Sequence, residues 1–242
     1  MNDIELSLII LCYRSGETVR EFVSRAESIV SSLTDRCEII LVGNYIVCNS
    51  DCTKEVVGKL AEESFRYKAI CLPKSGMMGW DMRLGLEAAQ GDYLCVIDGD
   101  GQFPLESIAQ CYQTIKTGEY DLVKTYRHKR HDGFYRASIC RIYNGLFSLL
   151  FPGLGSRDIN SKPKMLTRNA YHRMEITSDD WFVDAEIMLN VRRYKMAFFE
   201  FPVDFEALAG RASFVRFDAI FEFVKNLIRY RLLGFRNQKV GK

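Results

Sequence analysis

The sequence lacks a long hydrophobic run and a marked excess of charge of either sign. Its longest stretch without a charged residue runs from residue 142 to 156, shorter than the about 20 apolar residues that a membrane-spanning helix needs. The 33 basic and 31 acidic residues give a net charge of +2, which does not indicate a nucleic-acid-binding protein. We therefore expect no spanning helix and no nucleic-acid ligand.

Metal-binding cysteine patterns and a secretion signal are also missing. The chain has eight cysteines and three histidines, but its closest cysteine pair, Cys48 and Cys52, has no matching Cys/His pair that would complete a zinc site. Residues 1 to 5 (MNDIE) are acidic where a signal peptide carries positive charge. We expect a cytoplasmic chain whose cysteines are reduced.

The small net charge hides an uneven distribution. Residues 211 to 242 contain eight Lys or Arg and two Asp or Glu, which leaves 25 basic and 29 acidic residues in the rest of the chain. Apolar residues in this tail recur at helical spacing, at Phe217, Ile220, Phe221, Val224, Leu227 and Ile228. Such a helix either lies on an anionic membrane surface or packs on the domain. We expect a domain over residues 1–214 and a basic amphipathic helix over 215–242.

What the first half does contain is a regular alternation of apolar runs with longer helical patterns. Strands are predicted at residues 6–12, 37–42, 67–72 and 93–97, and helices at 17–33, 53–64 and 79–89. This order predicts an α/β fold with a mostly parallel sheet flanked by helices. Ligands of such sheets bind beyond the carboxyl ends of the strands.

Two carboxylates follow the fourth predicted strand directly. Asp98 and Asp100 alternate with glycines, and Gln102 and Pro104 come next. Paired carboxylates at a strand end suit a hard divalent cation, although Asp-Gly pairs also form ordinary turns. The buried-strand pattern before them places them at the expected ligand-binding edge.

Residues 85 to 93 (GLEAAQGDY), followed by Asp98, Asp100, Gln102 and Pro104, resemble the motif run of family 2 glycosyltransferases. These enzymes have the Rossmann-like GT-A fold, and the match is to their polyprenyl-phosphate branch. Weaker matches extend over about residues 5–215 and include Tyr13, the segments 121–127 and 158–164, Asp184-Ala185-Glu186 and residues 210–213.

The resemblance implies roles for individual residues. Asp98, Asp100 and Gln102 would bind Mg²⁺ or Mn²⁺ that bridges a donor diphosphate, or Asp98 would contact the ribose instead. Tyr13 and Asp98 would bind the nucleotide, and Asn44, although it departs from the family pattern, could still hydrogen-bond the base or ribose. Arg127, Arg136 and Arg211 are the expected phosphate contacts. Arg127 and Arg136 lie in a basic run directly after the fifth strand, and arginine binds phosphate bidentately, although such a run is also typical of a solvated surface. The expected catalytic residues are Asp100, Asp184 and Arg127.

Two segments depart from the family pattern. Gly43-Asn44-Tyr45 stands where the family usually has paired aspartates that hold the nucleoside, and Met77-Met78-Gly79 replaces a glycine-lysine loop. Either the donor differs from the usual ones or the site is degenerate.

The function predicted from these observations is a metal-dependent inverting glycosyltransferase on the inner face of the plasma membrane. It would move a sugar from a nucleotide-sugar donor to a polyprenyl phosphate, an acceptor that needs no base because it is already anionic. One alternative is transfer to a saccharide hydroxyl, which needs a carboxylate base such as Asp179, Asp180 or Asp184. A second is a non-catalytic scaffold. A nucleotidyltransferase is disfavoured because the N-terminal region has no clear glycine-rich triphosphate loop.

Overall fold

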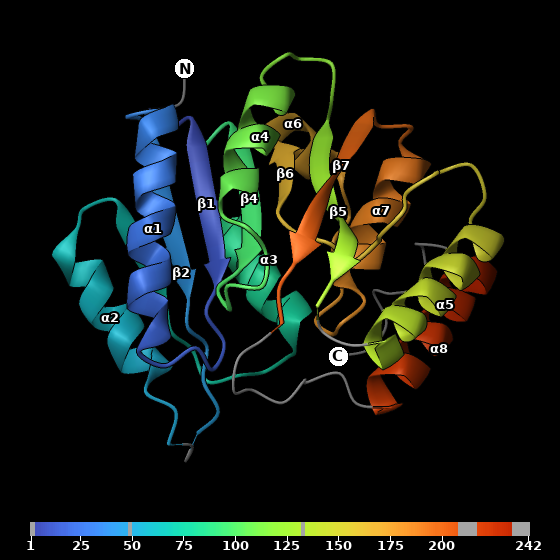
Figure 1. Ribbon diagram of the computed structural model, residues 1–242, viewed down its shortest axis with the longest axis horizontal. Coiled ribbons are helices and arrows are strands. Elements are labelled where there is room, and N and C mark those ends of the chain that lie inside the picture. The colour runs from blue at the N-terminus through green and yellow to red at the C-terminus, as the bar shows by residue number, and fades with distance from the viewer. Residues whose placement is uncertain (1–2, 48–49, 132–133, 208–216, 234–242) are drawn as a thin grey trace.

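The computed structural model of the protein describes residues 3–47, 50–131, 134–207 and 217–233 (Figure 1). Its elements are β1 (Leu6–Leu11), α1 (Thr18–Leu33), β2 (Cys37–Val42), α2 (Thr53–Glu63), β3 (Tyr67–Ile70), α3 (Met78–Ala88), β4 (Tyr93–Asp98), α4 (Glu106–Ile115), β5 (Leu122–Arg130), α5 (Phe134–Leu150), β6 (Lys164–Thr167), α6 (Arg168–Arg173), α7 (Val183–Arg193), β7 (Phe198–Phe205) and α8 (Phe217–Leu233). The strands and helices predicted for the first half are confirmed, with ends that differ by at most two residues.

The described strands form one seven-stranded sheet in the order β3-β2-β1-β4-β6-β5-β7. Within it, β1 runs parallel to β2 and β4, β2 to β3, and β5 to β7. Strand β6 runs antiparallel to both of its neighbours, β4 and β5. The predicted α/β fold with a mostly parallel sheet is confirmed.

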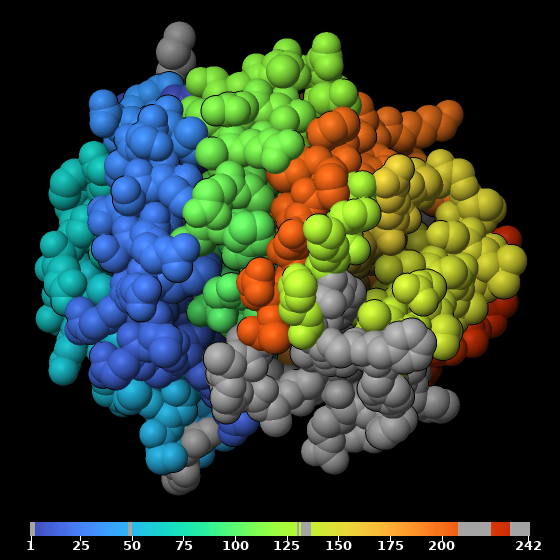
Figure 2. All heavy atoms as spheres, viewed as in Figure 1, coloured from blue at the N-terminus to red at the C-terminus, as the bar shows by residue number. Residues whose placement is uncertain are grey.

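Helices cover both faces of the sheet, and β1 supplies side chains to both cores. Leu8 and Ile10 pack with α1, α2 and α4, whereas Ile9 and Leu11 pack with α3, α5 and α7. This alternation follows from the two-residue period of a strand. Figures 1 and 2 look onto the face that α1 and α4 cover.

Helix α3 packs closely on the sheet because Gly85 has no side chain. A Cβ at this position would collide with Cγ2 of Ile9 in β1. Glycine allows the helix to approach the strand at this distance. This contact explains why the motif run that resembles the glycosyltransferases opens with a glycine.

Helices α5 and α8 lie side by side at one end of the molecule (Figure 1). Leu227 and Tyr230 of α8 are buried in the core that α5 and α7 share, whereas Ile228 and Leu232 are exposed. The predicted C-terminal amphipathic helix is thus present. Across the described ranges, none of the helices has the length and apolar character required to cross a membrane.

Candidate active site

The predicted carboxylates lie where β4 ends, at the carboxyl edge of the sheet. Asp98 is the last residue of β4, and the next residue, Gly99, donates its N–H to the carbonyl of Leu11 at the end of β1 (2.9 Å). The Asp98 side chain is 26% exposed. In the loop that follows, Asp100 Oδ1 accepts the backbone N–H of Gln102 (3.0 Å).

Gln102 fastens this loop to the end of β7. Its side-chain amide donates to the carbonyl of Glu206 (2.9 Å), and the N–H of Glu206 donates to the carbonyl of Gln102 (3.0 Å). Gln102 is 6% exposed. The structure therefore brings Asp98, Asp100 and Gln102 together on one loop, with the Gln102 amide nitrogen already engaged.

The donor set of this loop fits a magnesium-like cation that binds together with phosphates. Within the described ranges, three or more His, Cys, Asp or Glu side chains never gather closely enough to hold a metal by themselves. Mg²⁺ in phosphate-transfer sites is usually held by one or two carboxylates plus substrate oxygens and water. Asp98 and Asp100 supply this number of carboxylates.

The pairing of β4 with β6 brings a lysine to Asp98. Val96 lies opposite Lys164 in this antiparallel pair, so continuing the register by two residues on each chain places Asp98 opposite Lys162. Nζ of Lys162 lies 3.2 Å from Oδ1 and 3.3 Å from Oδ2 of Asp98. The same ammonium lies 3.3 Å from Oδ2 of Asp184 and 3.2 Å from Sδ of Met78.

Lys162 belongs to a buried group of charges that we call the lysine cluster: Lys124, Lys162 and Lys164 with Asp98, Asp184 and Glu200. Lys164 pairs with Asp184 at 2.5 Å, and Lys124 pairs with Glu200 at 2.9 Å. The three lysine side chains are at most 2% exposed.

Burial and pairing oppose each other within the cluster. Burial acts to raise the pKa of Asp184, but Lys162 and Lys164 outweigh it, so that this pKa lies below its ordinary value. Burial lowers the pKa of Lys164 to about 8 despite Asp184. For Lys162, by contrast, Asp184 and Asp98 outweigh burial and raise the pKa. Asp184 thus remains ionised at neutral pH.

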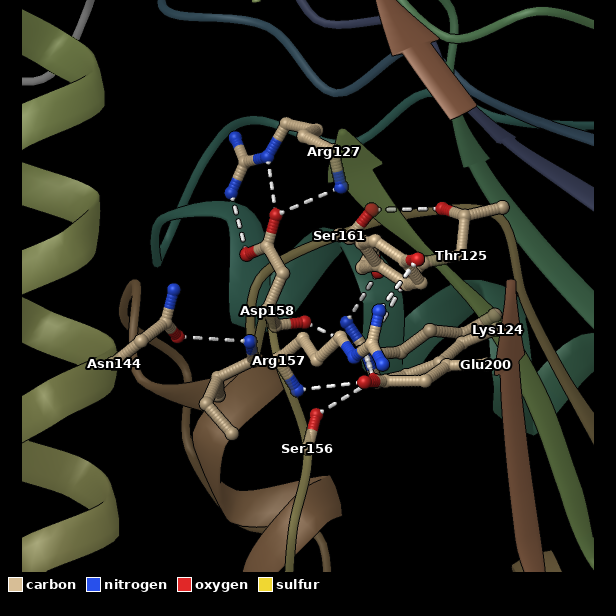
Figure 3. A network of polar contacts seen from close by, with 12 residues as sticks. Lys124, Thr125, Arg127, Asn144, Ser156, Arg157, Asp158, Ser161 and Glu200 are labelled. Atoms are coloured by element: carbon tan, nitrogen blue, oxygen red, sulfur yellow. Dashed lines mark hydrogen bonds and ion pairs between the residues drawn. The ribbon is translucent and has the colours of Figure 1, made fainter. Parts of the chain in front are cut away.

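Arg127, predicted to contact phosphates, forms a bidentate ion pair with Asp158 (Figure 3). Its Nε and one terminal nitrogen lie 2.6 and 2.7 Å from the two carboxylate oxygens. Although burial acts to raise the pKa of Asp158, Arg127 lowers it below the ordinary range. The pair joins the carboxyl end of β5 to the segment that precedes β6.

The segment 156–161 is held to β5 and β7 by further polar contacts (Figure 3). Lys124 Nζ donates to the carbonyl of Asp158 (2.6 Å), while Glu200 accepts the Ser156 hydroxyl (2.9 Å) and the N–H of Arg157 (2.6 Å). The hydroxyls of Thr125 and Ser161 are 2.7 Å apart. These contacts fix the backbone directly before Lys162.

A second buried polar group lies at the ends of β2 and β3, and we call it the Asn44 cluster: Asn44, Lys74 and Asp81. The Asn44 amide donates to Asp81 Oδ1 (2.8 Å), and its oxygen accepts the N–H of Leu72 (2.8 Å). Lys74 forms an ion pair with the other oxygen of Asp81 and lies 4.3 Å from the ring centre of Tyr13. Burial raises the pKa of Asp81 against the opposing effects of Lys74 and Asn44.

The segment Met77-Met78-Gly79, which differs from the family pattern, contacts the chain just before α7. The N–H of Met77 donates to the carbonyl of Asp179 (2.7 Å), and that of Gly79 to Asp180 (2.9 Å). A Cβ on Gly79 would collide with the carbonyls of Ser178 and Asp180. These residues serve an interface between α3 and the start of α7.

Acidic residues around the start of α7 also hold α8 in place. Asp180 accepts the N–H of Phe182 (2.8 Å) and the side-chain amide of Asn226 in α8 (2.7 Å). Glu186 accepts two backbone N–H groups from residues 177 and 178, and the hydroxyl of Tyr230 in α8 (2.5 Å). Asp180 and Glu186 therefore have structural partners.

Sequence reasoning did not single out several residues of these clusters. Lys162, Lys164, Lys74, Asp81 and Glu200 were not predicted as site residues. The closely spaced lysines on either side of Pro163 were the available signal, because they stand at the start of β6, the strand that returns beside β4. Of the predicted phosphate contacts, Arg136 lies in α5 but its side chain is not described, and Arg211 lies outside the described residues.

Comparisons with known proteins agree with the fold and the motif run. The glycosyltransferase AglD of Haloferax volcanii is 27% identical over 211 residues, covering 84% of this chain and 33% of AglD. The undecaprenyl-phosphate 4-deoxy-4-formamido-L-arabinose transferase of Edwardsiella ictaluri is 28% identical over 142 residues, covering 58% of this chain and 42% of that protein. The chain thus spans less than half the length of either relative.

A solved structure gives the same fold. Glucosyl-3-phosphoglycerate synthase of Mycobacterium tuberculosis, in complex with Mn²⁺, uridine diphosphate and phosphoglyceric acid, superposes with a TM-score of 0.73 at 15% identity. The match covers 94% of this chain and 78% of that one. The family model described as Glycosyl transferase family 2 matches residues 7–176. Because this match covers more than half of the chain, the protein belongs to glycosyl transferase family 2.

Proposed function

We propose that this glycosyltransferase moves a sugar from a nucleotide-sugar donor to a polyprenyl phosphate, with a divalent cation, in one inverting displacement. The observation that carries the proposal is the pair of carboxylates, Asp98 and Asp100, at the carboxyl edge of the sheet beside Lys162. The superposed mycobacterial enzyme was solved with Mn²⁺ and uridine diphosphate, and relatives of this chain are named for transfer to undecaprenyl phosphate.

Asp100 and Asp98 would hold Mg²⁺ or Mn²⁺, with Gln102 anchoring their loop. Bound there, the cation would stabilise the negative charge of the leaving nucleoside diphosphate. Tyr13 and Asn44 follow the ends of β1 and β2 and bind the nucleoside. Arg127, Arg136 and Arg211 remain the proposed phosphate contacts, and Asp158 orients Arg127.

The polar contacts favour an acceptor that brings its own negative charge. A hydroxyl acceptor needs a base within hydrogen-bond reach of the substrate. Asp184 is 1% exposed and paired with Lys162 and Lys164, so it acts on the site through Lys162 rather than by taking a proton. Asp179 pairs with Arg83, and Asp180 accepts the N–H of Phe182 just before α7 and the side-chain amide of Asn226. A prenyl phosphate needs only positioning.

We further propose that the enzyme lies on the inner face of the plasma membrane through α5 and α8. Both helices expose large apolar side chains, Ile142 and Leu149 on α5 and Ile228 and Leu232 on α8. The described side chains of α8, residues 224 to 232, include Lys225, Arg229 and Arg231 but no acid. Exposed apolar groups among cations suit an anionic lipid surface.

The proposal is tested by incubating the protein with Mn²⁺ and a panel of nucleotide sugars, with either polyprenyl phosphate or an oligosaccharide. Release of nucleoside diphosphate that requires polyprenyl phosphate would support the proposal. Release only with the oligosaccharide would overturn the acceptor, and no donor binding in calorimetry would favour a scaffold.

Asp100→Asn provides the matching variant, because it keeps the shape of the side chain and removes its charge. We expect turnover to fall more than about 100-fold, since even groups that merely support a metal ligand contribute 10- to 100-fold. Asp92→Asn is the control, because Asp92 is exposed and directly precedes the first residue of β4, at the other end of the strand from Asp98. It should retain activity. Unchanged turnover in Asp100→Asn would refute the metal role of Asp100.

A further inference from the structure

Lys162 places a positive charge beside the loop that carries Asp98 and Asp100, which we call the metal loop. Its ammonium lies almost equally far from the two carboxylate oxygens of Asp98, at 3.2 and 3.3 Å. A divalent cation that bound Asp98 through both oxygens would have to occupy the same position. Lys162 therefore fills the inner binding position of one of the two proposed metal ligands.

The surroundings keep this ammonium in place. The Lys162 side chain is 2% exposed, and its Nζ is also paired with Asp184 and contacts Sδ of Met78. Asp184 is fixed in turn by Lys164 at 2.5 Å. Because the ammonium group contacts Asp98, Asp184 and Met78 and is shielded from solvent, Lys162 keeps its charge at this position.

This arrangement changes the charge that a metal ion meets. Without Lys162, Asp98 and Asp100 would present two negative charges, whereas with Lys162 the pair with Asp98 is close to neutral and Asp100 carries the remaining charge. A like charge a few ångströms away weakens cation binding substantially in a partly buried site. A donor diphosphate restores the missing negative charge.

We propose that Lys162 is a built-in counter-ion of Asp98 that makes metal binding depend on the nucleotide diphosphate. This inference rests on the proposed function, because it takes Asp98 and Asp100 as the metal loop. The free enzyme binds the divalent cation weakly, and cation and diphosphate strengthen each other's binding by the same factor. Lys162 is in this sense a positioning residue for the metal and donor.

The test measures Mn²⁺ binding to the full chain by electron paramagnetic resonance, with and without uridine diphosphate, and requires no turnover. Lys162→Met should raise the Mn²⁺ affinity of the nucleotide-free protein by about tenfold and reduce the strengthening by uridine diphosphate. Lys164→Met is the matched control, since it removes a buried lysine from Asp184 that does not contact Asp98. It should leave nucleotide-free Mn²⁺ affinity within about threefold of the unmodified chain.

A double variant, Asp98→Asn with Lys162→Met, removes the pair together. Its nucleotide-free Mn²⁺ affinity should fall below that of Lys162→Met, because the double variant also lacks one of the two proposed metal ligands. This variant leaves no unpaired charge at the Asp98 position. Folding is checked by urea unfolding, and if Lys162→Met does not unfold cooperatively, Lys162→Gln is used in its place.

The outcomes separate this inference from the function it rests on. If the unmodified chain binds Mn²⁺ with uridine diphosphate but neither Lys162 variant gains nucleotide-free affinity, the counter-ion role is overturned and the metal loop stands. Equally tight Mn²⁺ binding to the unmodified chain with and without nucleotide also overturns it. If no variant binds Mn²⁺ under either condition, the metal-dependent function itself fails.

Discussion

Two buried carboxylates near the carboxyl edge of the sheet have pKa values shifted in opposite directions, although burial acts to raise both. Asp81 in the Asn44 cluster is paired with one lysine, Lys74, and its pKa is raised because burial dominates. Asp184 in the lysine cluster is paired with two lysines, Lys162 and Lys164, which outweigh burial and lower its pKa. The number of cations around each carboxylate decides the sign.

The two clusters also differ in their exposure to solvent. Asp81 and Lys74 have side chains that are 4% and 9% exposed, and Asn44 completes the polar contacts between them and the chain. The lysine cluster reaches solvent through Asp98, which is 26% exposed. A ligand that engages Asp98 therefore changes the charge balance of the lysine cluster directly.

Neutralising each carboxylate in turn should give the largest contrast. Asp184→Asn leaves two buried ammonium groups poorly compensated and should lower the free energy of unfolding by about 3 to 5 kcal/mol. Asp81→Asn replaces a carboxylate whose ionised form burial already disfavours and should lower it by about 1 to 2 kcal/mol. Urea unfolding of both variants measures the difference. Equal losses would mean that the two clusters are energetically alike.

The first half of the fold was predictable because its strands and helices follow from patterns within short stretches of the sequence. The apolar runs at β1, β2 and β4 alternate with helical patterns, and Asp98 follows directly from the end of a buried strand. The parallel order then places the ligand edge without any knowledge of packing. The position of the loop that carries Asp98 and Asp100 was predictable for the same reason.

The lysine cluster was not predictable because it depends on pairing between distant segments. Lys162 meets Asp98 only because β6 turns back between β4 and β5, and a sequence pattern does not state which strand lies beside which. Burial of a lysine also contradicts its usual preference for the surface. Similarly, Asn44 was predicted to face a nucleotide, and its bonds to Asp81 and Leu72 require the positions of β3 and α3.

A pH dependence of intermediate size should mark the lysine cluster. The folded chain releases the Lys164 proton near pH 8, whereas the unfolded chain holds it to about the ordinary value of 10.5. Between these values the unfolded state binds more protons, so the contribution of Lys164 to stability increases with pH, by up to about 3 kcal/mol.

This dependence is measured by urea unfolding of the unmodified chain and of Lys164→Met between pH 7 and about 10.5. Lys164→Met should show a flatter profile. Lys129→Met, at an exposed position on β5, should keep the profile of the unmodified chain. Parallel profiles for Lys164→Met and the unmodified chain would contradict the lowered pKa of Lys164.

The smallest effect concerns which side of the molecule meets a membrane. Helix α8 is attached to the start of α7, which carries Asp184 of the lysine cluster, through Asn226 on Asp180 and Tyr230 on Glu186. Exposed Lys225 should therefore contribute to binding of anionic vesicles, and Lys225→Ser should weaken it by about 1 kcal/mol, more visibly at low salt. Vesicle cosedimentation of the folded variants measures this effect.

A last test compares exposed apolar side chains on α8 with one that lies between α2 and β3, near the other edge of the sheet. Ile228→Ser with Leu232→Ser on α8 should weaken vesicle binding, because both side chains are exposed beside the cations of that helix. The matched control is Phe65→Ser, since Phe65 is 94% exposed but lies between α2 and β3, on the side of the sheet away from α8. Equal weakening by both changes would mean that vesicle binding follows exposed apolar area anywhere on the surface, and the lysine-cluster side would have no special relation to the membrane.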